Sequence, residues 1–135
     1  MDYSKFGNMM ERNRIESFKK WPFDDKKACS VKKMAEAGFY WSGNEREPDT
    51  VTCFVCNKTL DGWEPTDDPW KEHAKHAPQC NFVKYGRKEA DLTVQEFINV
   101  FSVAVKARMD KHFNKTLEDF RKCAEKEKEK LLLGK

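Results

Sequence analysis

Long apolar runs are missing from this sequence of 135 residues, and apolar side chains make up only 39% of it, against 36% for charged residues. No run reaches the roughly 18 apolar residues of a membrane span, so we expect no membrane partner. Residues 1–5 lack the apolar stretch of a signal peptide, so we expect a protein that is not secreted. The length suits one domain with an appendage.

The five cysteines are an odd number, and the cell interior keeps thiols reduced, so metal binding is a better hypothesis than disulfides. Cys53 and Cys56 form a C-x2-C pair, His73 follows after sixteen residues and Cys80 after six more. Three thiolates and one imidazole are a closed structural zinc set. We therefore expect one structural Zn²⁺ that stabilises a domain with a thin core, with no open position for catalysis. The other two cysteines are expected to be ordinary free thiols.

Glycine and proline punctuate residues 21–85 but are absent from 93–133. In the punctuated part we expect strands at 39–41, 51–53 and 59–61, and short helices capped by Ser30 and Asp68 that cover 31–37 and 69–76. Upstream, Met10, Ile15 and Phe18 recur near helical spacing, and Trp21-Pro22 is expected to end that helix. The predicted fold class is α+β: a small zinc domain with a three-stranded antiparallel sheet and short helices, followed by one long C-terminal helix.

Residues 93–133 show an unbroken helical pattern that begins with a capping box, Thr93-x-x-Glu96. A helix over 94–133 would be about 60 Å long, too long to bury its apolar stripe against a small domain. A return as a hairpin is the alternative, but no glycine or proline breaks the pattern before Gly134. We therefore expect an interface for partner helices, formed by Ile98, Phe101, Val105, Met109, Phe113, Leu117 and Phe120.

The net charge of +3 is unevenly distributed. Residues 43–72 contain three basic and eight acidic side chains, a net of −5, so the rest of the chain carries +8. An acidic middle suggests a cationic ligand, although solvated loops would give the same pattern. The overall charge is too small to indicate nucleic-acid binding, and we expect no direct DNA readout.

The pattern Gly38-x10-Asp49-x3-Cys53-x2-Cys56-x6-Trp63-x9-His73-x6-Cys80 resembles the BIR domain of the inhibitor-of-apoptosis family. Upstream, Arg14-Ile15-x2-Phe18-x2-Trp21-Pro22 matches the opening of that domain. The resemblance implies an N-terminal segment at 1–9, a BIR domain at 10–85, a linker at 86–92 and the long helix at 93–133.

BIR domains bind free protein N-termini, and the ligand adds as a strand beside Thr59-Leu60-Asp61. The resemblance and the local chemistry imply a peptide groove in which carboxylates beside Trp63 hold the α-amine of an N-terminal alanine. Its expected members are Lys58, Thr59, Leu60, Asp61, Trp63, Asp67, Glu72 and His76. His76 stands where apoptosis-type BIR domains usually carry Trp, and with Lys58 it could form a cationic site for a phosphate. The implied ligand is the tail of histone 3 phosphorylated on its third residue, threonine. The alternative is that the acidic residues and Lys58 are ordinary surface charges or helix caps, and that His76 only caps its helix.

The sequence also resembles family members that have a single BIR domain followed by one long helix, and this resemblance implies further partners. They bundle with INCENP-like and borealin-like helices in the chromosomal passenger complex, which indirectly places Aurora B kinase in dividing cells. The implied locations are the nucleus and cytoplasm, and the centromeres, spindle midzone and midbody during division. A homodimer through Phe6, Leu92, Val94 and Phe97 is also implied, but Glu89 replaces an aromatic residue that is common there. Ser30-Val31 likewise replaces a proline-directed threonine, so control by a cyclin-dependent kinase is not expected to carry over.

Three functions remain as hypotheses. The first is a non-enzymatic peptide reader and scaffold of cell division. The second is an apoptosis inhibitor that sequesters proteins with an N-terminal alanine or blocks caspases, which His76 in place of Trp disfavours. The third is a zinc hydrolase, which the closed ligand set and the lack of a nucleophile–base pair disfavour.

Overall fold

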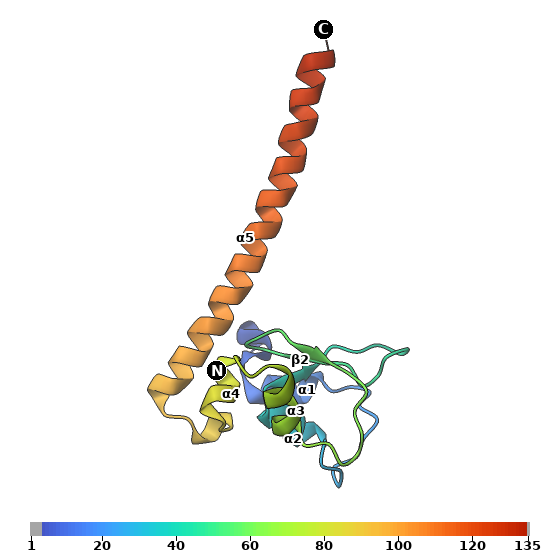
Figure 1. Ribbon diagram of the computed structural model, residues 1–135, viewed down its shortest axis with the longest axis vertical. Coiled ribbons are helices and arrows are strands. Elements are labelled where there is room, and N and C mark those ends of the chain that lie inside the picture. The colour runs from blue at the N-terminus through green and yellow to red at the C-terminus, as the bar shows by residue number, and fades with distance from the viewer. Residues whose placement is uncertain (1–3, 135) are drawn as a thin grey trace. The chain divides into compact units, whose positions relative to one another are not determined.

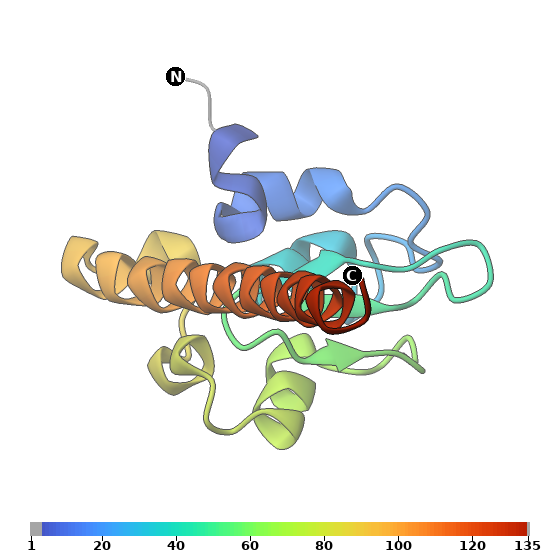
Figure 2. The same cartoon turned by 90° about the horizontal axis from the view of Figure 1, so that it is seen from above.

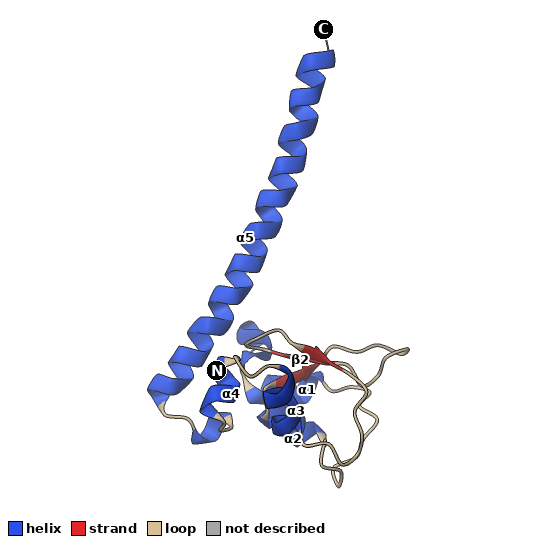
Figure 3. Ribbon diagram, in the orientation of Figure 1, coloured by secondary structure: helices blue, strands red, loops and turns tan. Residues whose placement is uncertain are grey.

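The computed structural model describes residues 4–134 and divides the chain into two compact units, Met1–Ala104 and Val105–Lys135. Figure 1 follows the elements along the chain, and Figure 3 shows that the strands are short and joined by loops. In chain order the elements are the 3-10 helix η1 (Ser4–Met9), α1 (Glu11–Ser17), α2 (Val31–Glu36), β1 (Phe39–Trp41), β2 (Val51–Cys53), β3 (Thr59–Leu60), α3 (Pro69–His76), α4 (Asn81–Tyr85), the 3-10 helix η2 (Glu89–Asp91) and α5 (Val94–Leu133). The predicted α+β class, with a small sheet, short helices and one long C-terminal helix, is confirmed.

The three strands form an antiparallel sheet in the order β1-β2-β3, so β3 is an edge strand. Leu60 pairs with Val51, and Thr59 pairs with Thr52. The predicted third strand was one residue too long, because Asp61 lies beyond the last pair of the ladder. The free edge of β3 leaves backbone donors and acceptors available to an added strand.

The short helices begin at the residues that the sequence indicated. Ser30 accepts a hydrogen bond from the backbone N–H of Lys33, and Asp68 accepts one from that of Trp70. Gly38 follows α2 with φ at +95°, where a side chain would be strained. A Cβ there would also lie 2.8 Å from the ring of Phe82, so this turn requires glycine.

Helix α1 differs from its predicted amphipathic pattern. It ends at Ser17, well before Pro22, and Ile15 is 40% exposed. Arg14 is the fully buried residue of this helix. Figure 2 shows α1, in blue, and α3, in green, on opposite sides of the sheet strands.

Arg14 stabilises the packing of α1 against the rest of the domain. Its guanidinium donates to the carbonyls of Ala35, Met9 and Asn8 and lies 4.2 Å above the ring of Phe54. Burial lowers the pKa of Arg14 to about 10, although nearby carboxylates oppose this shift, so the side chain stays charged at neutral pH. The charge is tolerated in the core because carbonyl oxygens and an aromatic face surround it.

Helix α5 begins with the predicted capping box. The hydroxyl of Thr93 accepts from the N–H of Glu96, and the Glu96 carboxylate accepts from the N–H of Thr93. Val100 and Ala104 are buried, and neither was singled out from the sequence. No helix in the described part of the chain is long and apolar enough to cross a membrane.

Replacing Arg14 with methionine should lower the free energy of unfolding by about 3 kcal/mol, because several buried carbonyls lose their donor. Urea denaturation of the zinc-loaded protein measures this change. The matched variant Arg46→Met alters an exposed arginine and should stay within about 0.5 kcal/mol of the parent. Equal stability of the two variants would show that the buried guanidinium has no stabilising role.

Candidate metal centre and peptide groove

Four side chains converge at the predicted zinc site. The sulfurs of Cys53, Cys56 and Cys80 and a ring nitrogen of His73 all lie within 4.8 Å of one another. The Cys53 and Cys80 sulfurs are 3.9 Å apart, and the Cys56 sulfur is 3.6 Å from Nε2 of His73. A tetrahedron with zinc–sulfur bonds of about 2.3 Å and a zinc–nitrogen bond of about 2.0 Å has sulfur–sulfur edges of about 3.8 Å and sulfur–nitrogen edges of about 3.5 Å. The donor set and its spacing therefore fit one Zn²⁺, and the predicted cofactor is confirmed.

The turn after β2 brings the first two ligands together. Cys53 ends β2, and its N–H donates to the carbonyl of Lys58, while the N–H of Asn57 donates to the carbonyl of Cys53. Asn57 has φ at +61°, a left-handed conformation that asparagine tolerates better than most residues. The N–H of Val55 points at the Cys53 sulfur from 3.3 Å, a contact that favours the thiolate.

The other two ligands come from the helical side of the domain. His73 lies on α3 and is fully buried, and Cys80 is the residue before α4. Nδ1 of His73 lies 2.8 Å from the carbonyl oxygen of Ala37. This contact assigns the proton to Nδ1 and turns Nε2 toward the sulfurs, as in other zinc sites with a histidine ligand. Ala37 precedes Gly38, so the same turn orients the metal ligand and starts the sheet.

The ligands perturb one another electrostatically. Burial raises the pKa of Cys53, whereas contacts with Cys53 and Cys56 lower that of Cys80. Burial opposes a charge on His73, but the sulfurs of Cys56 and Cys80 outweigh it and raise its pKa to about 9. Zinc must displace the protons that the thiols and the imidazole carry without the metal. Because more of these groups are protonated at lower pH, zinc affinity is expected to fall as the pH falls.

All five cysteines are free of disulfides, including the two outside the zinc set. Cys29 is fully buried, and its sulfur lies 3.3 Å from the carbonyl oxygen of Glu64. Cys123 is exposed on α5. Neither cysteine is part of the metal group.

A small pocket of about 40 Å³ lies between the end of β3 and helix α3. It is lined by Leu60, Asp61, Gly62, Trp63, Asp67, Glu72 and His76, which include six of the eight residues assigned to the groove from sequence. Three of these residues are carboxylates, so the pocket favours a cation. Trp63 is 7% exposed, and its ring packs edge-on against Trp21 and Phe39. The pocket therefore combines a rigid apolar wall with negative charge.

Backbone contacts position the acidic side chains and the wall. One oxygen of Asp67 accepts from the N–H of Glu64 at 2.8 Å, and Asp49 accepts from the N–H of Trp63 at 3.0 Å. The groups that would bind a ligand are thus held in place before it arrives. Gly62, with φ at +71°, lines the pocket but was not assigned from sequence.

The two other assigned groove residues, Lys58 and Thr59, do not line this pocket. The Thr59 hydroxyl lies 2.9 Å from that of Thr52 on the neighbouring strand. His76 lies 3.4 Å from Glu72, its partner one helical turn earlier. The structure therefore pairs His76 with an acid, where the sequence suggested a cationic pair with Lys58.

The predicted partner stripe on α5 is largely exposed. Exposed fractions range from 48% to 71% at Ile98, Met109, Phe113, Leu117 and Phe120, while Phe101 and Val105 are half-buried. Val94, from the expected homodimer set, is 78% exposed, and Leu92 and Phe97 are half-buried. Phe6 lies on η1, but its side chain is outside the described part of the structure.

Comparison with known proteins identifies the class of this domain. The sequence model of the Inhibitor of Apoptosis domain, BIR, matches residues 14–84, more than half of the chain. The matched region contains all four zinc ligands and every residue of the pocket. The chain therefore belongs to the BIR family of inhibitor-of-apoptosis proteins, and the resemblance indicated by its motifs is confirmed.

Individual relatives extend the similarity beyond the domain. Baculoviral IAP repeat-containing protein 5.2 of Xenopus tropicalis is 42% identical over 107 residues, which cover 79% of this chain and 69% of the relative. Baculoviral IAP repeat-containing protein 5 of Mus musculus is 41% identical over 115 residues, 85% of this chain and 82% of the relative. Protein 5 is also called survivin, so the chain is similar to survivin over most of its length.

Replacing Cys80 with alanine should abolish the stoichiometric zinc and unfold the BIR domain, because a structural zinc supplies on the order of 10 kcal/mol. Zinc content by atomic emission and thermal unfolding by circular dichroism measure the two effects. The matched control Cys123→Ala removes an exposed thiol and should keep one zinc per chain. A Cys80→Ala protein that retains both zinc and its melting temperature would contradict the assignment of Cys80 as a ligand.

Proposed function

We propose that the protein is a non-enzymatic reader of protein N-termini and a scaffold for partner helices. The zinc holds the domain together, and the peptide binds at the pocket beside β3. The observation that carries the proposal is the acidic pocket at the free edge of the sheet, with Trp63 as its wall. An α-amine suits the carboxylates, and an extended peptide suits the edge strand.

The size and charge of the pocket support a particular kind of N-terminus. A volume of about 40 Å³ leaves room for a small first side chain such as alanine. Asp61, Asp67 and Glu72 offer acceptors to the protonated amine, and N-acetylation would remove that charge. Since β3 is an edge strand, the following ligand residues can pair with Thr59 and Leu60 by backbone hydrogen bonds.

The proposed ligand is the tail of histone 3 with phosphate on its third residue, threonine. His76 lines the pocket, and Lys58 immediately precedes β3. Both side chains can donate hydrogen bonds to a phosphate a few residues beyond the amine. Glu72, which lies beside His76, also gives that imidazole a carboxylate partner before the ligand binds.

The proposed scaffold role rests on α5. The part of α5 in the second unit of the chain exposes Met109, Phe113, Leu117 and Phe120 along one helix. Other helices that cover such an apolar stripe would remove it from water and so stabilise the assembly. We assign the coverage to INCENP-like and borealin-like helices of the chromosomal passenger complex. The protein would then direct Aurora B kinase to centromeres, the spindle midzone and the midbody, and would be both nuclear and cytoplasmic.

Two further proposals concern catalysis and homodimerisation. The closed Cys3His set leaves no coordination position for a reacting water, which supports a role without catalysis. A homodimer through Phe6, Leu92, Val94 and Phe97 would compete with partner helices for the N-terminal end of α5. The carboxylate of Glu89, which stands where an aromatic residue is common in homodimers, accepts from the N–H of Glu11 at 3.1 Å and ties the linker to its own domain.

The alternative function is apoptosis inhibition through capture of N-terminal alanine peptides or caspases. It would use the same amine pocket but not the phosphate site. The polar pair of His76 and Glu72 offers a poor apolar wall to the later residues of such a ligand. The two functions therefore differ in their dependence on phosphate.

Calorimetry with four peptides separates the functions. They are the histone 3 tail with phosphothreonine at position three, the same tail unmodified, the phosphorylated tail with an acetylated N-terminus, and Ala-Val-Pro-Ile. The phosphorylated tail should bind about tenfold more tightly than the plain tail, since charge-assisted hydrogen bonds contribute about 1.5–3 kcal/mol. Acetylation should abolish binding.

The variant His76→Ala should reduce the preference for phosphate, whereas Lys75→Ala, on the same helix but outside the pocket, should retain it. Equal affinity for phosphorylated and plain tails would refute the histone-reading proposal. Tight binding of Ala-Val-Pro-Ile in that case would favour the alternative function.

A further inference from the structure

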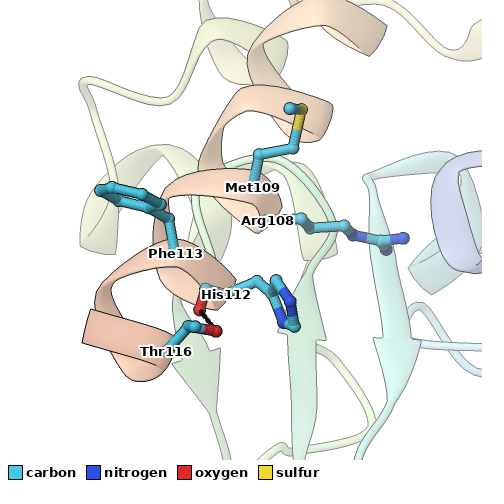
Figure 4. Close-up of a pocket in the computed structure, with 5 residues that line it drawn as sticks. All are labelled: Arg108, Met109, His112, Phe113 and Thr116. Atoms are coloured by element: carbon cyan, nitrogen blue, oxygen red, sulfur yellow. Dashed lines mark hydrogen bonds between the residues drawn. The ribbon is translucent and has the colours of Figure 1, made fainter. Parts of the chain in front are cut away.

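One side of the exposed stripe on α5 carries an arginine and a histidine, Arg108 and His112, that form no ion pair among the residues the structure describes. Arg108, Met109, His112, Phe113 and Thr116 surround an open hollow on the helix surface. In Figure 4, Phe113 projects to one side of the helix, and Arg108 and His112 project to the other. Within the described part of the chain, Arg108 and His112 form no ion pair, so their donors are available to a ligand.

On the opposite border of the stripe, the charged side chains around Arg121 pair with one another within the helix. Arg121 donates to Glu118 at 2.6 Å and to Glu125 at 2.5 Å. These contacts raise the pKa of Arg121 and lower that of Glu118. The stripe therefore has one self-paired border and one border that offers unpaired donors.

These borders restrict what can cover the stripe. In a second copy of the chain, the carboxylates of Glu118 and Glu125 are already held by Arg121. A helix with its own unpaired carboxylates would find partners in Arg108, a permanent charge, and in His112, a hydrogen-bond donor. Charge complementarity at the edges of a helical stripe selects partners in this way.

We propose that the helix covering Met109 and Phe113 carries acidic side chains along the edge that faces Arg108 and His112. This inference rests on the proposed role of α5 as a scaffold and adds the chemistry by which the partner is chosen. Apolar contacts with Met109 and Phe113 supply most of the affinity, and the border sets specificity and register. The free donors of Arg108 and His112 then favour a partner helix that has unpaired carboxylates along this edge.

Two synthetic helical peptides test the proposal on the full chain. They share one stripe of leucine and isoleucine and differ only at the border positions, which are glutamate in one peptide and lysine in the other. Fluorescence anisotropy should show about fivefold tighter binding of the acidic peptide, as expected for one exposed ion pair with Arg108 and one hydrogen bond from His112. High salt should reduce the difference, because it screens exposed charges.

The double variant Arg108→Glu/His112→Glu should reverse this preference. The control Lys111→Glu/Lys122→Glu changes two charges on the far side of the helix from Met109 and Phe113 and should retain it. Equal binding of the two peptides, or an equal effect of the two double variants, would overturn the acidic-edge proposal. The variant Phe113→Glu tests the proposed scaffold role separately from the acidic-edge proposal. If both peptides bind this variant as tightly as they bind the parent, the stripe is not the docking surface and the scaffold role fails as well.

Discussion

A single zinc ion, held by residues from both sides of the domain, is the constraint on which the rest of the structure depends. Cys53 ends β2, Cys56 lies in the turn that follows, His73 is on α3, and Cys80 immediately precedes α4. A sheet of three strands, none longer than three residues, has little intrinsic stability. The metal joins this sheet to the helices and thereby fixes the relative positions of β3 and α3, which form the two sides of the peptide pocket.

The proposed binding of a peptide would then depend on the metal site. His73 and His76 lie on the same helix, one as a metal ligand and the other at the pocket. The ring of Phe39 packs against both His73 and Trp63, so the apolar wall is in contact with the ligand shell. In the proposed function, a metal without an open coordination position contributes by holding the pocket beside it rigid.

The sequence predicted the features that depend on local chemistry. The ligand spacing, the caps at Ser30, Asp68 and Thr93, and the glycine at position 38 each follow from the needs of one turn or one metal. The sequence did not predict features that arise from tertiary packing. The pattern of α1 suggested an apolar face, but the structure buries Arg14, because carbonyl oxygens from α2 and from the segment before α1 converge there. Helix α4 has only five residues, too few for a periodic signal. Val100 and Ala104 do stand at helical spacing with Phe97 and Phe101, but spacing alone does not tell which part of a long apolar stripe its own domain buries.

X-ray absorption at the zinc edge of the purified full chain tests the central claim most directly. The account predicts a first shell of three sulfurs at about 2.3 Å and one nitrogen at about 2.0 Å, with the scattering pattern of an imidazole and no water. This shell should stay unchanged when an N-terminal peptide binds, since the pocket uses the wall beside the metal and leaves the coordination sphere intact. An oxygen ligand in the first shell, or a ligand that is exchanged on peptide binding, would contradict a closed structural site.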